Sequence, residues 1–295
     1  MRIVSLLPSA TDIVCALGLR DYLVGRTHEC DWPPGIEEVP AVTSDVLATH
    51  EMSSRQIDEA IDSAAHSGSS IYGLDTQALD RAKPDLIITQ ELCEVCAVSY
   101  SDVQRAARLI DADTRIVSLE PTSLDDIFDN ILFIGELTGA EQRARNVVED
   151  GRARLAGLRA VEPRPRVACI EWLDPIFAGG HWVPDQVQAA GGVDVLGPVH
   201  EPTYEIPWPA VIDAQPDVLV LMPCGMSIDR TTSELGAITS RNGFADLPAA
   251  RHGRVFVVDG SSYFNRPGPR VVRGAEILHA LINGDSVPET DAVSV

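Results

Sequence analysis

Cysteine and histidine residues follow three short apolar runs of this sequence, at positions where they could bind a metal. They are His28 and Cys30, the Cys-x-x-Cys pair Cys93 and Cys96, and Cys224. Thiolate and imidazole are good ligands for zinc, copper or cobalt, whereas a Cys-x-x-Cys pair is equally typical of a redox dithiol. We treat all five as candidate metal ligands, with redox chemistry and simple burial of free cysteines as the alternatives.

Motifs of common catalytic sites are absent from the sequence. It contains no nucleophile-elbow serine, no P-loop and no His-Glu-x-x-His, and the absence of Gly-x-Gly-x-x-Gly argues against a bound dinucleotide. Asp174 and Asp185 could serve acid–base chemistry, but carboxylates beside proline and glycine in an acidic protein are usually solvated. We therefore predict that the protein is not an enzyme, with thiol-dependent chemistry as the one enzymatic alternative.

The two halves of the chain repeat one pattern. A helix-like end, a Pro-Asp step and an apolar run occur in DRAKPDLIITQ (residues 80–90) and again in DAQPDVLVLMP (residues 213–223). The openings of the halves, at 2–18 and 165–180, are also alike. Internal similarity at this spacing implies two lobes of one architecture, and clefts between domains are preferred ligand sites.

Alternation of apolar runs with helical patterns predicts an α/β fold with two Rossmann-like lobes, each containing a parallel sheet. In such lobes the segments beyond the carboxyl ends of the strands face the ligand. Four regions are expected: an N-terminal lobe, a long connecting helix weakened by glycines near Gly139, a C-terminal lobe and a flexible tail. Their bounds are 1–121, 122–161, 162–284 and 285–295. Strands of the first lobe are predicted at 3–7, 22–26, 86–89 and 115–119, and helices at 53–64, 75–82 and 98–109.

The composition excludes some partners. A net charge of −21 over 295 residues argues against nucleic acid and anionic membrane surfaces, and no apolar run approaches the ~20 residues of a membrane span. Lys83 is the only lysine and the acidic residues are dispersed, which favours a halophilic acidic protein over codon bias. Met1 is followed directly by a predicted strand, which favours a cytoplasmic location, or an extracytoplasmic one if a leader was trimmed.

Five segments, in this order, resemble the cobalamin-binding members of the substrate-binding proteins whose two lobes are joined by one long helix. They are SLLPSATDIVCALGL (5–19), KPDLIITQ (83–90), PIFAGGHWVPDQVQAAGGVDVLG (175–197), IPWP (206–209) and RPGPRVVRGAEIL (266–278). The resemblance covers nearly the whole chain. It implies a helical-backbone periplasmic-binding-protein fold that binds a corrinoid, a cobalamin-like ligand, in the interlobe cleft.

The resemblance also implies ligand contacts, because a corrin is a broad apolar disc rimmed by amides. The matching positions are Pro8, Phe177, Trp208 and Arg270; Trp182, Tyr263 and Phe264 are further candidates beside the matched motifs. The alternatives are core packing for the aromatics, a surface salt bridge for Arg270 and a turn at Pro8. His28 would suit an axial ligand to the corrin cobalt.

Transporter-coupled members of the family carry a glutamate on each lobe that docks against the permease of an ABC transporter. The matching places here hold Gln77 and Pro209, with Glu205 nearby. This departure weakens the permease as a partner and favours an intracellular carrier over a component of cobalamin uptake. The remaining alternatives are a ferric-siderophore or haem-type receptor of an ABC transporter, and a thiol-based metal or redox protein using Cys93 and Cys96.

Overall fold

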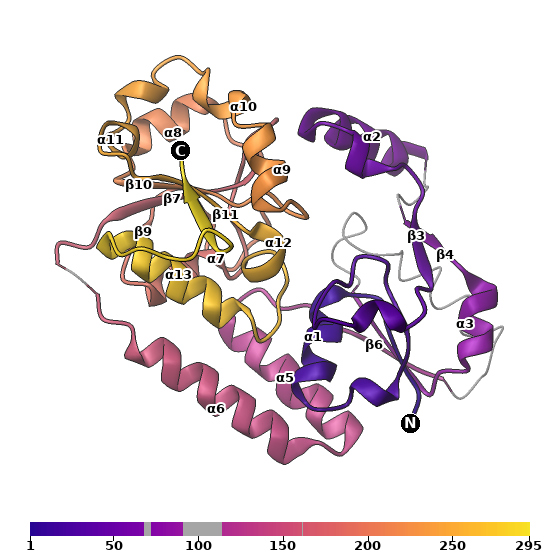
Figure 1. The fold of residues 1–295 in the computed structure, drawn as a ribbon. Coiled ribbons are helices and arrows are strands. Elements are labelled where there is room, and N and C mark those ends of the chain that lie inside the picture. The colour runs from indigo at the N-terminus through magenta and orange to yellow at the C-terminus, as the bar shows by residue number, and fades with distance from the viewer. Residues whose placement is uncertain (68–71, 91–113, 161) are drawn as a thin grey trace. The chain divides into compact units, whose positions relative to one another are not determined.

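The computed structural model describes residues 1–67, 72–90, 114–160 and 162–295. The chain divides into two compact units. The N-terminal unit comprises Met1–Met52, Gln56–Glu120 and Phe128–Val148, and the C-terminal unit comprises Ser53–Arg55, Pro121–Ile127 and Glu149–Val295. Each unit contains its own sheet flanked by helices, so the predicted α/β class with two similar lobes is confirmed (Figure 1).

The sheet of the N-terminal unit is wholly parallel, in the order β2-β1-β5-β6. Its strands are β1 (Ile3–Ser5), β2 (Leu23–Arg26), β5 (Leu86–Thr89) and β6 (Arg115–Ser118). They coincide with the predicted strands to within a few residues, and β1 and β5, at the centre of the sheet, are buried along their whole length. A separate antiparallel pair joins β3 (Thr43–Asp45) to β4 (Tyr72–Leu74).

The helices of this part of the chain begin where the sequence provides caps or proline. Pro8 opens α1, and the Asp75 carboxylate accepts hydrogen bonds from two backbone N–H groups of α3. The α-helices are α1 (Pro8–Ala16), α2 (Ser54–Ser67) and α3 (Thr76–Ala82), and the 3₁₀ turns are η1 (Arg20–Tyr22), η2 (Ile36–Glu38) and η3 (Thr49–Glu51). The helix predicted at 98–109 lies outside the described residues.

The connector consists of two consecutive helices rather than one. α5 (Leu124–Thr138) and α6 (Glu141–Gly157) are separated at Gly139, whose φ of 68° is left-handed and ends α5. Gly135 has a different role, since a Cβ on it would come within 2.4 Å of the Ala144 side chain. Gly139 therefore permits the turn between the two helices, and Gly135 permits their close approach. Within the described ranges, no helix is long and apolar enough to cross a membrane.

The sheet of the C-terminal unit has the order β12-β11-β10-β7-β8, with β9 also paired to β7. Alternate residues of the central strands pack into separate apolar clusters, such as Val167 and Cys169 in one and Ala168 and Ile170 in the other. The strands are β7 (Arg166–Trp172), β8 (Phe177–Ala178), β9 (Val193–Asp194), β10 (Val218–Leu221), β11 (Val255–Val258) and β12 (Ala292–Ser294).

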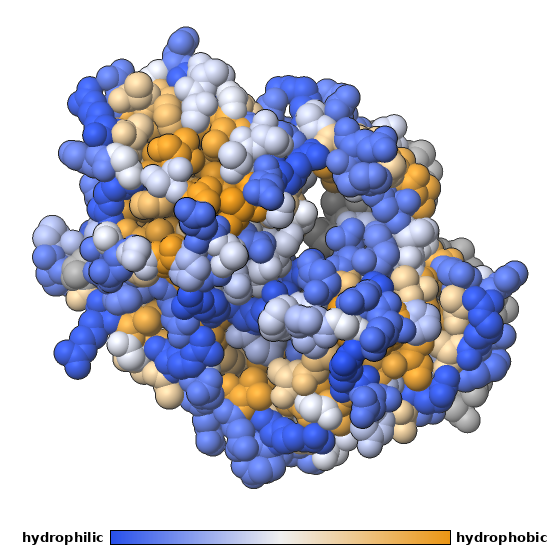
Figure 2. All heavy atoms as spheres, in the orientation of Figure 1, coloured by the Kyte–Doolittle hydropathy of each residue, from blue (hydrophilic) through white to orange (hydrophobic). Residues whose placement is uncertain are grey.

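Helices cover this second sheet (Figure 1). They are α7 (Val183–Ala189), α8 (Trp208–Ala214), α9 (Ile228–Ser233), α10 (Gly236–Thr239), α11 (Pro248–Arg251), α12 (Gly260–Tyr263) and α13 (Val271–Asn283), with a 3₁₀ turn η4 (Phe244–Asp246). Hydrophilic residues are spread over the visible face of the molecule, in keeping with the dispersed charge of the sequence (Figure 2).

The prediction of a flexible tail is wrong for the last residues of the chain. β12 pairs antiparallel with β11, and Val257 lies opposite Val293. Asp291, just before β12, accepts a hydrogen bond of 2.7 Å from Arg273 and one of 3.2 Å from the Tyr263 hydroxyl. These partners lie far back along the chain, so the short polar sequence of the tail does not reveal them.

One hydrogen-bonded arrangement occurs at the amino end of both sheets. In the N-terminal unit the Arg2 N–H donates to Asp85 Oδ2 (2.7 Å) and the Asp85 N–H donates to the Arg2 carbonyl (2.9 Å). In the C-terminal unit Arg166 and Asp217 make the same two bonds, each of 2.8 Å. The repeated Pro-Asp step of the sequence is therefore a repeated structural element, which we call the Arg–Asp staple.

The helix that precedes each staple also ends in the same way. α3 and α8 are each followed by a C-cap residue, Lys83 and Gln215, with left-handed φ angles of 41° and 42°. Pro84 and Pro216 follow, and proline cannot continue a helix. Each helix therefore stops at the same point relative to the next strand, which brings the aspartate to the neighbouring arginine.

Candidate functional site

Several of the predicted ligand contacts lie at the carboxyl end of the sheet in the C-terminal unit. Phe177 is in β8, Trp182 caps α7, and Tyr263 closes α12; all three are partly exposed. The Trp182 indole N–H donates to the Phe264 carbonyl at 2.7 Å, which fixes the orientation of the ring. Burial, together with Asp291, raises the pKa of the Tyr263 hydroxyl, and Arg270, at the start of α13, offsets this only in part.

Phe264 corrects one prediction. Its side chain is 0% exposed and belongs to the apolar core, so it is not available to a ligand in this structure. The adjacent Tyr263 and Trp182 are partly buried and pack against the same core. The aromatic-rich sequence at 263–264 therefore divides into one residue at the edge of the sheet and one in the core.

Glu171, at the end of β7, is a titratable residue that the sequence analysis missed. One of its carboxylate oxygens accepts a hydrogen bond from the Gly180 N–H at 3.1 Å, and Asn265 also bonds its side chain. Burial outweighs both bonds and raises the pKa of Glu171 from 4.5 to about 7. The available signal was a glutamate in the otherwise apolar run at residues 167–172 of β7.

Trp208 is the first residue of α8. This end of the helix lies on the side of the sheet where the parallel strands have their carboxyl ends. Its indole N–H donates to the Asn242 carbonyl at 2.8 Å, and the Arg241 guanidinium lies 5.8 Å from its ring centroid. Arg241 also approaches Asp174 Oδ1 at 3.6 Å. The predicted ligand contact Trp208 is therefore partly exposed and linked through Arg241 to a second polar group.

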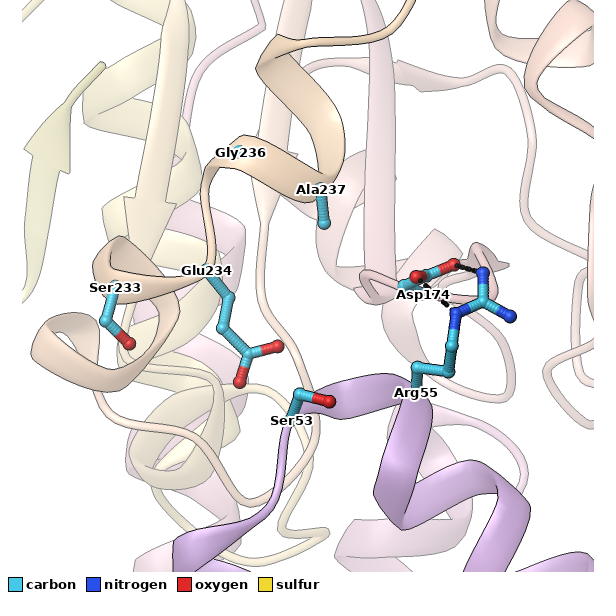
Figure 3. A pocket seen from close by; sticks show the side chains of 7 residues that line it. All are labelled: Ser53, Arg55, Asp174, Ser233, Glu234, Gly236 and Ala237. Carbon is cyan, nitrogen blue, oxygen red and sulfur yellow. Dashed lines mark hydrogen bonds and ion pairs between the residues drawn. The ribbon is translucent and has the colours of Figure 1, made fainter.

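Asp174 lines a pocket of about 280 Å³ that lies wholly within the C-terminal unit (Figure 3). Arg55 makes a bidentate pair with Asp174, at 2.9 and 2.7 Å. On the other side, Glu234 accepts the backbone N–H of Ser54 at 2.9 Å and also its hydroxyl. Ser54 and Arg55 are thereby held by two carboxylates of their own unit, and the bond between Ser54 and Glu234 spans 180 residues of sequence, which the sequence analysis did not predict.

Asp174 and Asp185, weighed in the sequence as an acid–base pair, both have structural partners. Asp185 accepts the backbone N–H of Leu124, at the start of α5, and lies 2.9 Å from His200 Nε2. Asp174 is bound by Arg55. Their contacts therefore explain both carboxylates without catalysis.

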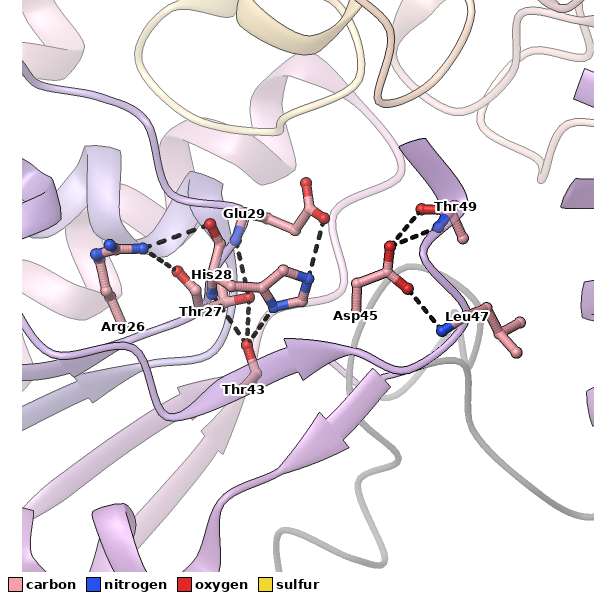
Figure 4. Close-up of polar contacts among 8 residues, drawn as sticks. All are labelled: Arg26, Thr27, His28, Glu29, Thr43, Asp45, Leu47 and Thr49. Carbon is pink, nitrogen blue, oxygen red and sulfur yellow. Dashed lines mark hydrogen bonds and ion pairs between the residues drawn. The ribbon is translucent and has the colours of Figure 1, made fainter. Parts of the chain in front are cut away.

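His28 is embedded in a polar network at the carboxyl end of β2 (Figure 4). Its Nδ1 lies 2.7 Å from Thr43 Oγ1, and the same hydroxyl accepts the His28 backbone N–H at 3.0 Å. Its Nε2 is buried, 3.2 Å from a Glu29 carboxylate oxygen. Neither nitrogen is open to an incoming cobalt, so this histidine joins β2 to β3 and does not fit the predicted axial ligand.

The cysteines of the described part do not form a metal site with their neighbours. Cys30 is 5% exposed, and its sulfur lies 3.0 Å from Thr11 Oγ1. Cys224 is partly exposed, and its N–H donates to the Glu171 carbonyl at 3.0 Å. Among the residues that the structure describes, no three His, Cys, Asp or Glu side chains are arranged to hold a metal ion. Cys93 and Cys96 lie outside the described residues.

Three further predicted positions are found on helices. Pro8 is partly exposed at the start of α1, directly after β1, and therefore lies at the carboxyl end of the first sheet. Gln77 and Pro209 are each the second residue of their helix, α3 and α8, and both are exposed. The two places matched to the docking glutamates are thus equivalent in the structural repeat, and neither carries an acid.

Two α/β units, each built on a largely parallel sheet, are the architecture of solute-binding proteins. The chain belongs to the periplasmic binding protein family, whose model matches residues 3–261. The predicted resemblance to the cobalamin-binding members is confirmed by a vitamin B12-binding protein of Vibrio cholerae. It is 26% identical over 280 residues, which cover 93% of this chain and 86% of the relative.

Two other relatives widen the comparison. An uncharacterized ABC transporter substrate-binding lipoprotein of Bacillus subtilis is 22% identical over 98% of this chain and 82% of its own length. The crystal structure of a periplasmic heme-binding protein from Pseudomonas aeruginosa superposes with a TM-score of 0.72 at 22% identity, covering 97% of this chain and 94% of that one. Relatives of the same fold thus carry different ligands.

Proposed function

We propose that this chain binds a corrinoid and acts as the substrate-binding component of a cobalamin uptake system. The observation that carries the proposal is the set of partly exposed aromatic side chains at the carboxyl end of the second sheet. Phe177, Trp182 and Trp208 occupy these positions, within sequence segments that resemble those of cobalamin-binding proteins. Binding, rather than catalysis, is the activity proposed.

The chemistry of these residues suits a corrin. Indole and phenyl faces offer rigid apolar area to a wide disc at little cost in side-chain entropy. Arg270 provides a cation for amide oxygens or a phosphate at the rim of the ligand. The pocket beside Asp174 has a volume of about 280 Å³, below the roughly 300–1,000 Å³ of pockets for drug-sized ligands, and we do not assign the corrinoid to it.

The lipoprotein relative supports a role in transport. It favours a location outside the cytoplasm over the cytoplasmic one expected from the sequence, and an uptake component over an intracellular carrier. Gln77 and Pro209 are exposed and uncharged, so docking to a permease would use surfaces other than the two expected glutamates. In the C-terminal unit, the acidic residue nearest to Pro209 before α8 is Glu205, which is exposed.

Haem is the second candidate ligand, because the fold is shared with a heme-binding protein at a TM-score of 0.72. Absorbance titration of the reduced protein with aquacobinamide, cyanocobalamin, haemin and a ferric siderophore tests both candidates. Saturable binding of a corrinoid in preference to haemin supports the proposal. Preference for haemin or the siderophore refutes it, and failure of all four ligands directs attention to the thiol chemistry of Cys93 and Cys96.

A pair of variants tests the aromatic contact. Trp208→Leu should weaken corrinoid binding at least about fivefold, because a stacked aromatic contact contributes roughly 1 kcal/mol beyond its buried area. Tyr22→Leu is the matched control: Tyr22 is exposed but lies just before β2, at the amino end of the first sheet. Equal affinities for the two variants would contradict the assignment of Trp208.

A further inference from the structure

His181 occupies an unusual backbone position at the carboxyl end of the second sheet. Its φ is 51°, in the left-handed region that residues other than glycine seldom adopt. The backbone is held there from both sides: the His181 N–H donates to the Glu201 carbonyl at 2.7 Å, and the His200 N–H donates to the His181 carbonyl at 3.2 Å. A strained residue kept by its surroundings is a reason to look for a function.

The two glycines before His181 are packed so closely that neither has room for a side chain. A Cβ on Gly180 would come within 2.5 Å of the Thr203 backbone nitrogen, and one on Gly179 within 2.8 Å of the Val183 side chain. The imidazole ring is packed beside Trp182, with ring centroids 5.5 Å apart. The backbone position of His181 is therefore set before any ligand arrives, and its ring rests against the Trp182 indole.

The imidazole nitrogens of His181 make no hydrogen bond to any residue that the structure describes, although the side chain is half-buried. Other histidines are engaged: His28 with Thr43, His200 with Asp185, and His279 with the Ala190 carbonyl. A preorganised imidazole with free nitrogens, placed four residues after Phe177 and next to Trp182, is suited to bind a metal centre carried by the ligand.

We propose that the His181 imidazole is the axial protein ligand to the cobalt of the bound corrinoid. This inference rests on the proposed function and assigns to His181 the role that the sequence suggested for His28. The lone pair of one imidazole nitrogen fills an axial position of cobalt, and the water that held that position leaves. No electron is transferred, and the oxidation state of cobalt is unchanged.

His181→Asn tests the proposal, because asparagine tolerates the left-handed conformation while removing the imidazole. Aquacobinamide, whose axial water can be replaced, should show a shifted visible band on binding to the unmodified protein. The shift should disappear in H181N, and the affinity should fall about tenfold or more. Dicyanocobinamide, in which both axial positions are blocked, should bind the two proteins alike.

His200→Asn is the matched control, since His200 also has a left-handed φ, of 61°, and should keep the band shift. A shift that persists in H181N, or corrinoid binding by the unmodified protein without any shift, overturns the assignment. Complete absence of corrinoid binding instead refutes the proposed function itself. The two failures are therefore distinguishable.

A spectroscopic measurement covers the case in which H181N fails to fold. With the unmodified protein and cobalt(II) cobinamide, an axial ¹⁴N ligand splits the electron paramagnetic resonance lines into triplets. Labelling the histidines with ¹⁵N should turn each triplet into a doublet. Unsplit lines, or splitting insensitive to the label, would rule out histidine coordination.

Discussion

Replacing Glu171 by glutamine tests whether burial controls the protonation of the carboxyl group at the end of β7. Glutamine keeps an oxygen that can accept the Gly180 N–H, bonded at 3.1 Å in the structure, and it removes the charge. The variant therefore separates the hydrogen bond from the ionisation. Its effect should depend on pH, because only the native side chain titrates.

The magnitude follows from the raised pKa. Burial raises the pKa of Glu171 from 4.5 to about 7, so the folded state binds this proton more tightly than the unfolded state does. The stability associated with the proton is fully present below pH 4.5 and is lost as the pH rises through about 7. At roughly 1.4 kcal/mol per pH unit, the loss amounts to about 3 kcal/mol.

Urea unfolding of E171Q and the unmodified protein, at pH 4.5 and pH 8, measures this difference. Relative to the unmodified protein, E171Q should gain about 3 kcal/mol in free energy of unfolding between the two pH values. The comparison at each pH removes the background from the other acidic groups. Glu289→Gln, at an exposed position, is the control and should show no such gain.

Two outcomes would refute the reasoning about Glu171. One is a stability difference between E171Q and the unmodified protein that is the same at both pH values. The other is a ¹³C NMR titration in which the side-chain carboxyl of Glu171 ionises near 4.5. Either would mean that the hydrogen bonds from Gly180 and Asn265 fully offset the effect of burial on the pKa.

Two further predictions concern single contacts. Arg55→Ala removes the bidentate partner of Asp174. Because the arginine side chain is 60% exposed, the free energy of unfolding should fall by at most about 1 kcal/mol, and by less in about 1 M salt. A larger, salt-insensitive fall in melting temperature would contradict this. Gly180→Ala should destabilise the protein by about 1–3 kcal/mol, because the new Cβ meets the Thr203 backbone at 2.5 Å. Gly157→Ala, with open space around it, should be neutral or slightly stabilising in the same urea experiment.

The strands that carry a clear apolar run could be predicted from the sequence because their signals are local. The apolar runs after each Pro-Asp step locate β5 and β10, and their repetition revealed two lobes. Contacts between distant residues were not visible in this way. The partners of Asp291 make the tail part of a sheet, and the bond between Ser54 and Glu234 joins segments that have no shared pattern.

The candidate site was predicted less completely, for a physical reason. A residue type indicates which chemistry is available, but the neighbours decide whether its atoms are free. His28 has suitable chemistry and its ring is occupied by Thr43. His181, which the sequence analysis did not single out, makes no side-chain hydrogen bond to the described residues. Phe264 and Tyr263 are adjacent and both aromatic, yet only one is fully buried.

The Arg–Asp staples separate the requirements for folding from those for ligand choice. Both staples lie at the amino ends of the sheets, where the two halves of the chain have kept the same bonds. At the opposite ends the halves have diverged, to a His28 network in one and to the loop of Phe177 and His181 in the other. Mutational drift at the carboxyl ends can therefore alter specificity while the scaffold persists. Directed evolution toward new ligands should randomise those loops and leave the staples untouched.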